Sequence, residues 1–249
     1  MPTTLLCLHG WGGSKESFTE LREGLQGTDI TILTPDLPGF GDEPEPKEPW
    51  TTDDYVEWVV KWFQANKPPL PNPLPSGEGK MRLFILGHSH GGRIALKIAS
   101  QELLPIDNLF LCAAAGVKHP RHIKRIFGLT LAKAGKFLLR IPGLKMLQPI
   151  GKKLLYKLVR VHDYEKASPI MRQTLINVSK EDLKPLLPSI RIPTDIFWGE
   201  DDRMTPIGDA HVMHTLIMGS RLHVYPGVRH AVHRDRAWEI AQLVHSALQ

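Results

Sequence analysis

A serine, a run of acidic residues and a histidine occupy positions in this chain at which they could together carry out nucleophilic catalysis. Ser89 is the centre of a G-x-S-x-G pattern, residues 87–91, between an apolar run and a helical pattern. Glycines on both sides of the serine leave room for a sharp strand-to-helix turn that exposes the hydroxyl. Acidic residues at 200–202 and the imidazole of His230 each follow a later apolar run. The sequence therefore holds a nucleophile and the two kinds of group that could activate it.

A serine hydroxyl becomes a good nucleophile only when a base accepts its proton and an acid orients that base. The order along the chain is serine, acid, histidine, which is the order that a G-x-S-x-G turn of this kind requires. His230 is the predicted base, and His233, three residues later, is the competing candidate. On this pattern alone, Glu200, Asp201 and Asp202 all remain candidates for the acid.

Short apolar runs alternate with helical patterns along most of the chain. The predicted strands cover residues 4–8, 30–34, 81–86, 109–114, 194–198 and 222–225. Helices are predicted after a Ser14 cap and over residues 51–66 (capped by Thr52 or Asp53), 93–103, about 168–178 and about 234–247. This alternation indicates an α/β fold with a mostly parallel sheet and helices on both faces. Because the carboxyl ends of parallel strands meet at one edge, the three kinds of group above are expected to gather there.

The composition is that of a globular protein, since 42% of the 249 residues are hydrophobic and 23% are charged. The two cysteines, Cys7 and Cys112, both lie in apolar runs, which excludes a disulfide scaffold and favours a reducing compartment. The first ten residues lack the basic and apolar regions of a signal peptide, so a cytoplasmic location is expected. No run approaches the roughly 18 apolar residues of a membrane span. Neither metal-ligand spacing nor a nucleotide fingerprint is present, so we expect no metal and no cofactor.

Two segments interrupt the alternating pattern. Residues 67–80 contain five prolines and two glycines and are predicted to form a surface loop. Residues 117–190 are predicted to form a helical cap inserted into a core domain made of residues 1–116 and 191–249. Between 118 and 160 there are twelve Lys or Arg and no acidic residue, with apolar residues at helical spacing. The cations either face water while the apolar side covers the sheet, or contact anionic surfaces or acidic substrates. We expect no binding to nucleic acid.

Five motifs together resemble the α/β-hydrolase superfamily, in its branch of small capped serine esterases and carbon–carbon bond hydrolases. They are HGWGG at 9–13, DLPGFG at 36–41, GHSHGG at 87–92, IPTDIFWGEDD at 192–202 and PGVRH at 226–230. The resemblance implies that Ser89 is the nucleophile, that His230 is the base, and that Asp202, three residues after the glycine, is the acid. It also implies an oxyanion hole made of the backbone N–H groups of Trp11 and His90. Asp36 is expected to hold loops in place.

This resemblance implies hydrolysis of carboxylic esters with a small to medium acyl group, through an acyl-enzyme and without a cofactor. The alternatives are hydrolysis of carbon–carbon bonds, lactones or thioesters with the same three residues, or a non-catalytic receptor for a small molecule. The chain departs from the family pattern by starting directly on the strand before HGWGG, so a sheet of about six strands is expected, with the first two family strands missing. Either a monomer or a homodimer is expected. His90 is an unusual neighbour for the nucleophile and is predicted to be a partly exposed wall of the pocket.

Overall fold

The computed structural model describes residues 2–69, 81–118 and 167–247. The chain divides into two compact units, of which one comprises Met1–Lys118 with Gln173–Gln249 and the other His119–Arg172. The larger unit contains every candidate site residue and is the one described below. Almost all of the predicted loop 67–80, and residues 119–166 of the predicted cap, lie outside the described residues. The roles predicted for the basic segment therefore stay predictions.

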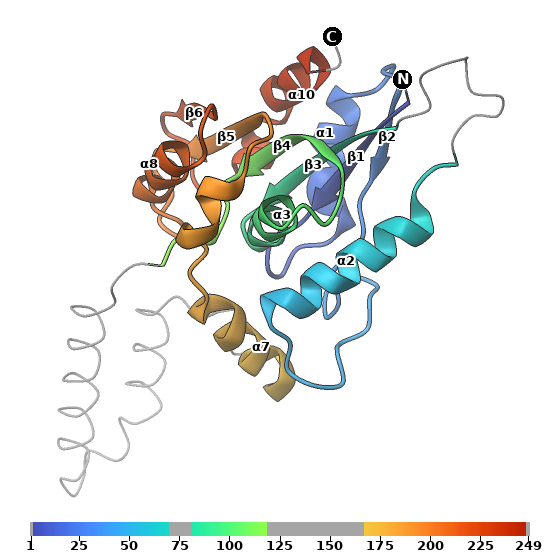
Figure 1. Cartoon of the computed structure of the whole chain (residues 1–249), viewed down its shortest axis with the longest axis vertical. Helices are drawn as coiled ribbons and strands as arrows, with labels where there is room; N and C mark the ends of the chain where they lie inside the picture. Colours follow the sequence, from blue (N-terminus) through green and yellow to red (C-terminus); the bar gives the residue numbers. More distant parts are fainter. Residues whose placement is uncertain (1, 70–80, 119–166, 248–249) are drawn as a thin grey trace, which may run out of the picture. The chain divides into compact units, whose positions relative to one another are not determined.

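Within the described residues, the strands form one sheet of six in which every pairing is parallel. The order across the sheet is β2-β1-β3-β4-β5-β6 (Figure 1). The bounds are β1 Thr3–Leu8, β2 Ile30–Leu33, β3 Arg82–His88, β4 Ile106–Cys112, β5 Thr194–Gly199 and β6 Arg221–Tyr225. Each predicted strand is present, and the predicted parallel α/β sheet is confirmed.

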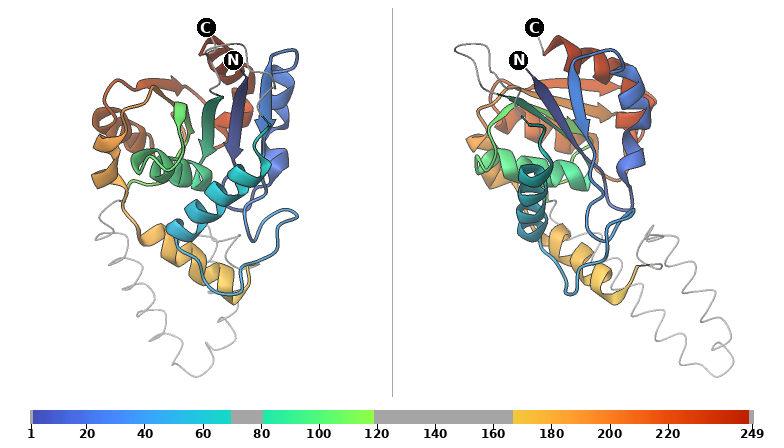
Figure 2. Two further views of the ribbon diagram at one scale, coloured as in Figure 1. Left: turned by 45° about the vertical axis from the view of Figure 1, so that its right-hand side comes forward. Right: turned by 90° about the vertical axis from the view of Figure 1, so that its right-hand side faces the viewer.

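Helices cover both faces of this sheet (Figure 2). On one face α1 packs against α10, and on the other α2 packs against α3. The described helices are α1 Thr19–Gly24, α2 Thr52–Asn66, α3 His90–Ser100, α7 Pro169–Lys180, α8 Ile207–Leu216, α9 Val232–Asp235 and α10 Ala237–Ser246. Two 3-10 segments, η1 Lys15–Phe18 and η3 Lys184–Ser189, complete this part of the chain. None of the described helices is long and apolar enough to cross a membrane.

Some helix boundaries differ from the prediction. Helix α2 is capped by Thr51, whose hydroxyl accepts from the Asp54 amide while the Asp54 carboxylate accepts from the Thr51 amide. The prediction of Thr52 or Asp53 as the cap was wrong, because this reciprocal pair satisfies the end of the helix one residue earlier. Thr52 is buried instead. Helix α8 was not predicted, since its buried residues include only one large apolar side chain, Met213.

The centre of the sheet forms the core. Phe84, Phe110 and Phe197 belong to the adjacent strands β3, β4 and β5, and all three are fully buried. The ring centroids of Phe84 and Phe110 are 5.8 Å apart, and those of Phe110 and Phe197 are 6.4 Å apart. These rings link the strands whose carboxyl ends precede the candidate site. Cys7 and Cys112 are free and buried.

Replacing Phe110 with alanine is expected to lower the free energy of unfolding by about 3–5 kcal/mol, because a large cavity would remain between two packed rings. Urea denaturation followed by circular dichroism measures this change. Leu103→Ala is the control, because Leu103 is 42% exposed and its truncation should cost within about 0.5 kcal/mol. Equal losses for the two variants would contradict the assignment of this aromatic row to the core.

Candidate active site

Ser89 forms the turn between β3 and α3. Its backbone has φ 51° and ψ −111°, in a region that non-glycine residues rarely adopt. The turn is held because the Ser89 amide donates to the Cys112 carbonyl at 3.1 Å and the Ala115 amide donates to the Ser89 carbonyl at 2.9 Å. Such strain persists only where the surrounding structure enforces it, and it is common at functional sites. Ser89 keeps partial exposure to solvent.

The glycines after Ser89 are required by close packing within the first turn of α3. A Cβ at Gly91 would lie 2.0 Å from the Leu8 carbonyl oxygen, and one at Gly92 would lie 2.5 Å from the Ala114 Cβ. The helix therefore begins at His90 and not at Arg93 as predicted. The prediction was wrong because it treated both glycines as turn residues, whereas they allow the helix to approach β1 and the chain after β4.

Asp202 and His230 form a hydrogen-bonded pair. His230 Nδ1 lies 2.7 Å from Asp202 Oδ2, and the Asp202 carboxylate is fully buried while the imidazole is 16% exposed. Because the carboxylate accepts, His230 donates from Nδ1 and its Nε2 is left as the acceptor, which is the tautomer a base needs. Burial acts to raise the pKa of Asp202, but the hydrogen bond from His230 outweighs it with help from Thr205 and the Met204 amide. The pKa of this carboxyl is therefore held below its ordinary value.

The competing acids and the competing base have other surroundings. The side chains of Glu200 and Asp201 are exposed. The Glu200 amide donates a hydrogen bond to the Tyr225 carbonyl, and the Asp201 amide donates one to the Val228 carbonyl, each at a distance of 3.0 Å. The backbone of these two residues therefore holds the loop after β5 against the turn before His230. His233 is buried, and its ring lies 3.7 Å from the ring of His88. Of these candidates, the structure pairs Asp202 with His230.

Thr205 is a residue of the site that the sequence analysis missed. Its hydroxyl lies 2.7 Å from Asp202 Oδ2 and 3.2 Å from the Ala113 carbonyl oxygen. Its amide donates to Asp202 Oδ1 at 3.1 Å. Thr205 thereby fixes the orientation of the carboxylate. The only signal for it in the sequence is a short polar side chain three residues after an acid, which is too common to single out a position.

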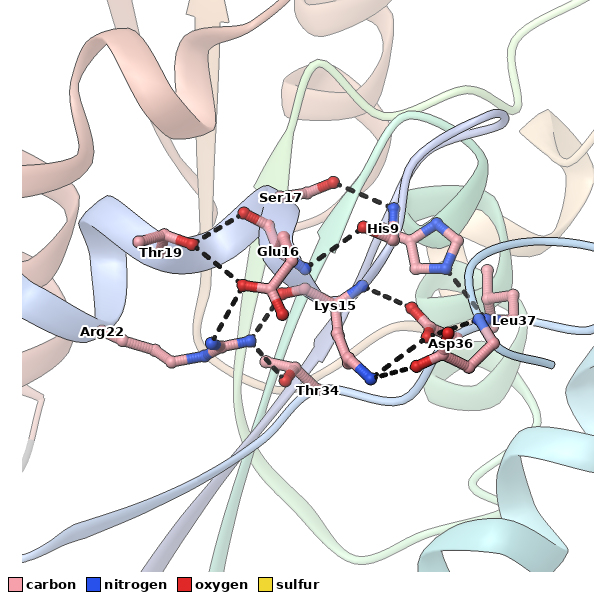
Figure 3. Close-up of polar contacts among 11 residues, drawn as sticks. His9, Lys15, Glu16, Ser17, Thr19, Arg22, Thr34, Asp36 and Leu37 are labelled. Atoms are coloured by element: carbon pink, nitrogen blue, oxygen red, sulfur yellow. Dashed lines mark hydrogen bonds and ion pairs between the residues drawn. The ribbon is translucent and has the colours of Figure 1, made fainter.

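A network of polar contacts joins the loops at 9–13 and 36–42 (Figure 3). The Leu37 amide donates to His9 Nε2 at 2.9 Å, so His9 carries its proton on Nδ1, which lies 2.8 Å from the Gly10 carbonyl oxygen. The buried Asp36 carboxylate accepts from the amides of Lys15 at 2.6 Å and Asp42 at 2.9 Å. Asp36 thus holds loops in place, as predicted from its motif.

Trp11 and His90 lie side by side, and His90 directly follows Ser89 in the chain. Their rings meet edge to face, with centroids 5.5 Å apart. His90 is the first residue of α3, so its N–H has no acceptor within the helix and stands at the positive end of the helix dipole. The loop of Trp11 can approach the turn because Gly10 lacks a side chain; a Cβ there would lie 3.2 Å from Ser89 Cβ.

The side chain of His90 is buried, which corrects the prediction of a partly exposed pocket wall. The rings of Trp11 and Tyr55 pack against it, with the Tyr55 centroid at 4.8 Å. Burial, assisted by the charges of Arg93 and His9, lowers the pKa of His90 to about 3, so the ring is neutral. The sequence could not indicate this burial, because the rings that cover His90 come from distant parts of the chain.

Four buried histidines are expected to make the protein sensitive to acid. Burial lowers the pKa of His9, takes that of His88 well below 6.5, and lowers those of His90 and His233 to about 3. Below about pH 6.5 the unfolded chain binds protons that the folded chain does not, so stability is present above that pH and is lost as the pH falls. Each histidine lowers the free energy of unfolding by at most about 1.4 kcal/mol for every pH unit of acidification.

The midpoint of thermal unfolding, measured from pH 7.5 to 5, should therefore fall steeply, well before the aspartates titrate. The variant His90→Gln has one fewer titrating group, and its profile should be shallower. A midpoint temperature that does not change across this pH range would contradict the burial of neutral histidines.

Among the residues that the structure describes, no cluster of three or more His, Cys, Asp or Glu is placed to hold a metal ion.

Comparison with known proteins places these motifs in a family. The model of the alpha/beta hydrolase family matches residues 5–242. Lipase 1 of Psychrobacter immobilis is 25% identical over 210 residues, which cover 80% of this chain and 62% of that lipase. The pimeloyl-(acyl-carrier protein) methyl ester esterase of Neisseria meningitidis is 25% identical over 252 residues, which cover 95% of this chain and 90% of that esterase. An esterase structure from Exiguobacterium antarcticum shares the fold, with a TM-score of 0.71 at 23% identity over 99% of this chain and 92% of that chain.

Proposed function

Because the chain belongs to the alpha/beta hydrolase family, we propose that it is a serine hydrolase that cleaves carboxylic esters with a small to medium acyl group. One observation carries the proposal. Ser89 stands on a strained turn at the carboxyl edge of the sheet, and the hydrogen-bonded pair of Asp202 and His230 follows two further strands at that edge. A nucleophile, a base and an orienting acid are thereby supplied by three rigid elements.

In the proposed reaction, His230 Nε2 accepts the hydroxyl proton as Ser89 Oγ attacks the ester carbonyl carbon. The oxyanion that forms accepts hydrogen bonds from the backbone N–H groups of Trp11 and His90, and each such donor is worth about 2.7–4 kcal/mol in comparable enzymes. The intermediate then collapses, and the alcohol leaves with the proton from His230. Water attacks the acyl-serine by the same route and releases the acid.

The relatives support the choice of an ester over other acyl compounds. Two of them, at 25% identity, are named for the hydrolysis of lipids and of a methyl ester. The buried carboxylate of Asp202 supports the role of His230, because an ionised acid beside Nδ1 stabilises the imidazolium that forms when the base accepts a proton. The restriction to small or medium acyl groups stays a prediction from the family resemblance.

A panel of p-nitrophenyl esters of increasing chain length, with a lactone and a thioester added, tests the proposal. We expect saturable turnover that is fastest with short and medium acyl chains. If the lactone or the thioester is turned over faster than every ester of the panel, that class of compound becomes the proposed substrate in place of the ester. Binding of these compounds without any turnover would favour a receptor and would overturn the proposal.

A further inference from the structure

His88 lies where the three loops of the candidate site meet, although the proposed mechanism gives it no task. It is the residue before Ser89, and its Nε2 lies 3.0 Å from the backbone carbonyl oxygen of His230. The ring of His233 packs against it, with centroids 3.7 Å apart and planes tilted by 31°, and the centroid of the His230 ring lies 4.9 Å away. The loop of Gly10 lies against another side of this ring, so close that a Cβ on Gly10 would be 2.8 Å from His88 Nδ1. One buried side chain therefore contacts the segments of the proposed nucleophile, base and oxyanion hole.

The carbonyl of His230 takes no part in the helix that follows it. Helix α9 begins at Val232, and its first hydrogen bonds run from the amides of Arg234 and Asp235 to the carbonyl of Ala231. The His230 carbonyl therefore lies just outside the hydrogen-bond ladder of the helix. The hydrogen bond to the carbonyl of His230 comes from the side chain of His88.

This contact fixes the protonation of His88. A carbonyl oxygen can only accept, so Nε2 must carry a proton and donate it. Burial, together with the nearby His233 and His230, keeps the pKa of His88 well below its ordinary value, so the ring stays neutral with its lone pair on Nδ1. The neighbouring His233, whose pKa is also lowered by burial, adds no charge at neutral pH.

We propose that His88 is a positioning residue for the proposed base, which it holds by donating a hydrogen bond from Nε2 to the main chain of His230. The inference rests on the proposed function. The other partners are anchored independently: Ser89 by the chain after β4, and Asp202 by Thr205 and the Met204 amide. The imidazole of His230 is attached to Asp202, and its backbone is attached to His88. These two attachments together fix the orientation of the His230 imidazole.

Two substitutions separate the hydrogen bond from the rest of the side chain. In His88→Gln the amide nitrogen reaches approximately the place of Nε2 and can donate, whereas in His88→Asn the shorter amide cannot reach the carbonyl.

A fluorophosphonate reports the reactivity of Ser89 without an ester, because a P–O bond to Oγ forms, fluoride leaves and the base takes the proton. We expect His88→Asn to lower the labelling rate and kcat by about tenfold to a hundredfold with little change in KM, and His88→Gln to stay within about threefold.

The signal of the proton between His230 Nδ1 and Asp202 gives a readout that does not depend on turnover. In proton NMR spectra this far-downfield signal should be present in the wild-type protein and in His88→Gln, and broadened or lost in His88→Asn. If the asparagine variant does not fold, His88→Phe serves in its place, since it keeps a ring for His233 to pack against but has no donor. Retention of both the signal and the labelling rate in a folded variant without the donor would overturn the inference.

His223 supplies a matched control. Its Nε2 also makes a hydrogen bond, 2.8 Å to Asp195, and its ring stacks on Phe197 at 4.8 Å, but on the β5–β6 pair away from Ser89. His223→Asn should lower the melting temperature while the labelling rate stays within about twofold. A loss of labelling as large as that of His88→Asn would show a general effect of destabilisation and would contradict the positioning role. If Ser89 of the wild-type protein is not labelled at all, the proposed function fails, and the NMR comparison alone then decides whether His88 orients His230.

Discussion

Replacing Ser89 with alanine is expected to lower ester turnover by about 10⁴-fold or more, because no other group supplies the oxygen that forms the acyl-enzyme. The measurement is the initial rate with the best ester of the panel, together with labelling by the fluorophosphonate. Alanine keeps the backbone at φ 51° under the same strain, so the melting temperature should change little.

Ser89→Gly is the informative companion of this variant. Glycine adopts the left-handed backbone without a steric cost, so the free energy of unfolding should rise by about 1 kcal/mol while activity is lost to the same degree. Such a gain in stability with loss of activity is typical of a strained functional position. Ester turnover above a few per cent of wild type in either variant would show that Ser89 is not the nucleophile.

Replacing Asp202 with asparagine is expected to lower kcat by about 10³- to 10⁴-fold. The amide group can donate towards Nδ1, which favours the tautomer in which Nε2 carries the proton. In that tautomer the imidazole cannot accept the proton of Ser89. The loss should appear in kcat with little change in KM, because the acid does not contact the substrate.

Asp201→Asn is the matched control, since it makes the same chemical change one residue earlier on an exposed side chain. Its turnover should remain within about twofold of wild type, because only an exposed side chain changes and the backbone amide that contacts Val228 is kept. Both variants are compared at the pH optimum of the wild-type protein, after their folding has been checked by circular dichroism. A larger loss in Asp201→Asn than in Asp202→Asn would reverse the assignment of the acid.

The sequence by itself determined the order of the strands and the edge at which the chemistry gathers. Each strand is a short apolar run, and runs that alternate with helices indicate a parallel sheet whose carboxyl ends share one edge. The G-x-S-x-G pattern specified the turn because only glycine tolerates the contacts at Gly87 and Gly91. These signals are local, arising from residues a few positions apart, and they can therefore be recognised in a single sequence.

Only the tertiary structure decided which side chains within that edge meet. The contact between His88 and the carbonyl of His230 joins residues 142 positions apart, and the bond from Thr205 to the Ala113 carbonyl joins residues 92 positions apart. Likewise, His90 is neutral because Trp11 and Tyr55, from a loop and a helix elsewhere in the chain, bury its ring. Such contacts leave no periodic trace in the sequence, because each partner is chosen by packing between elements and not by the spacing of neighbours along the chain.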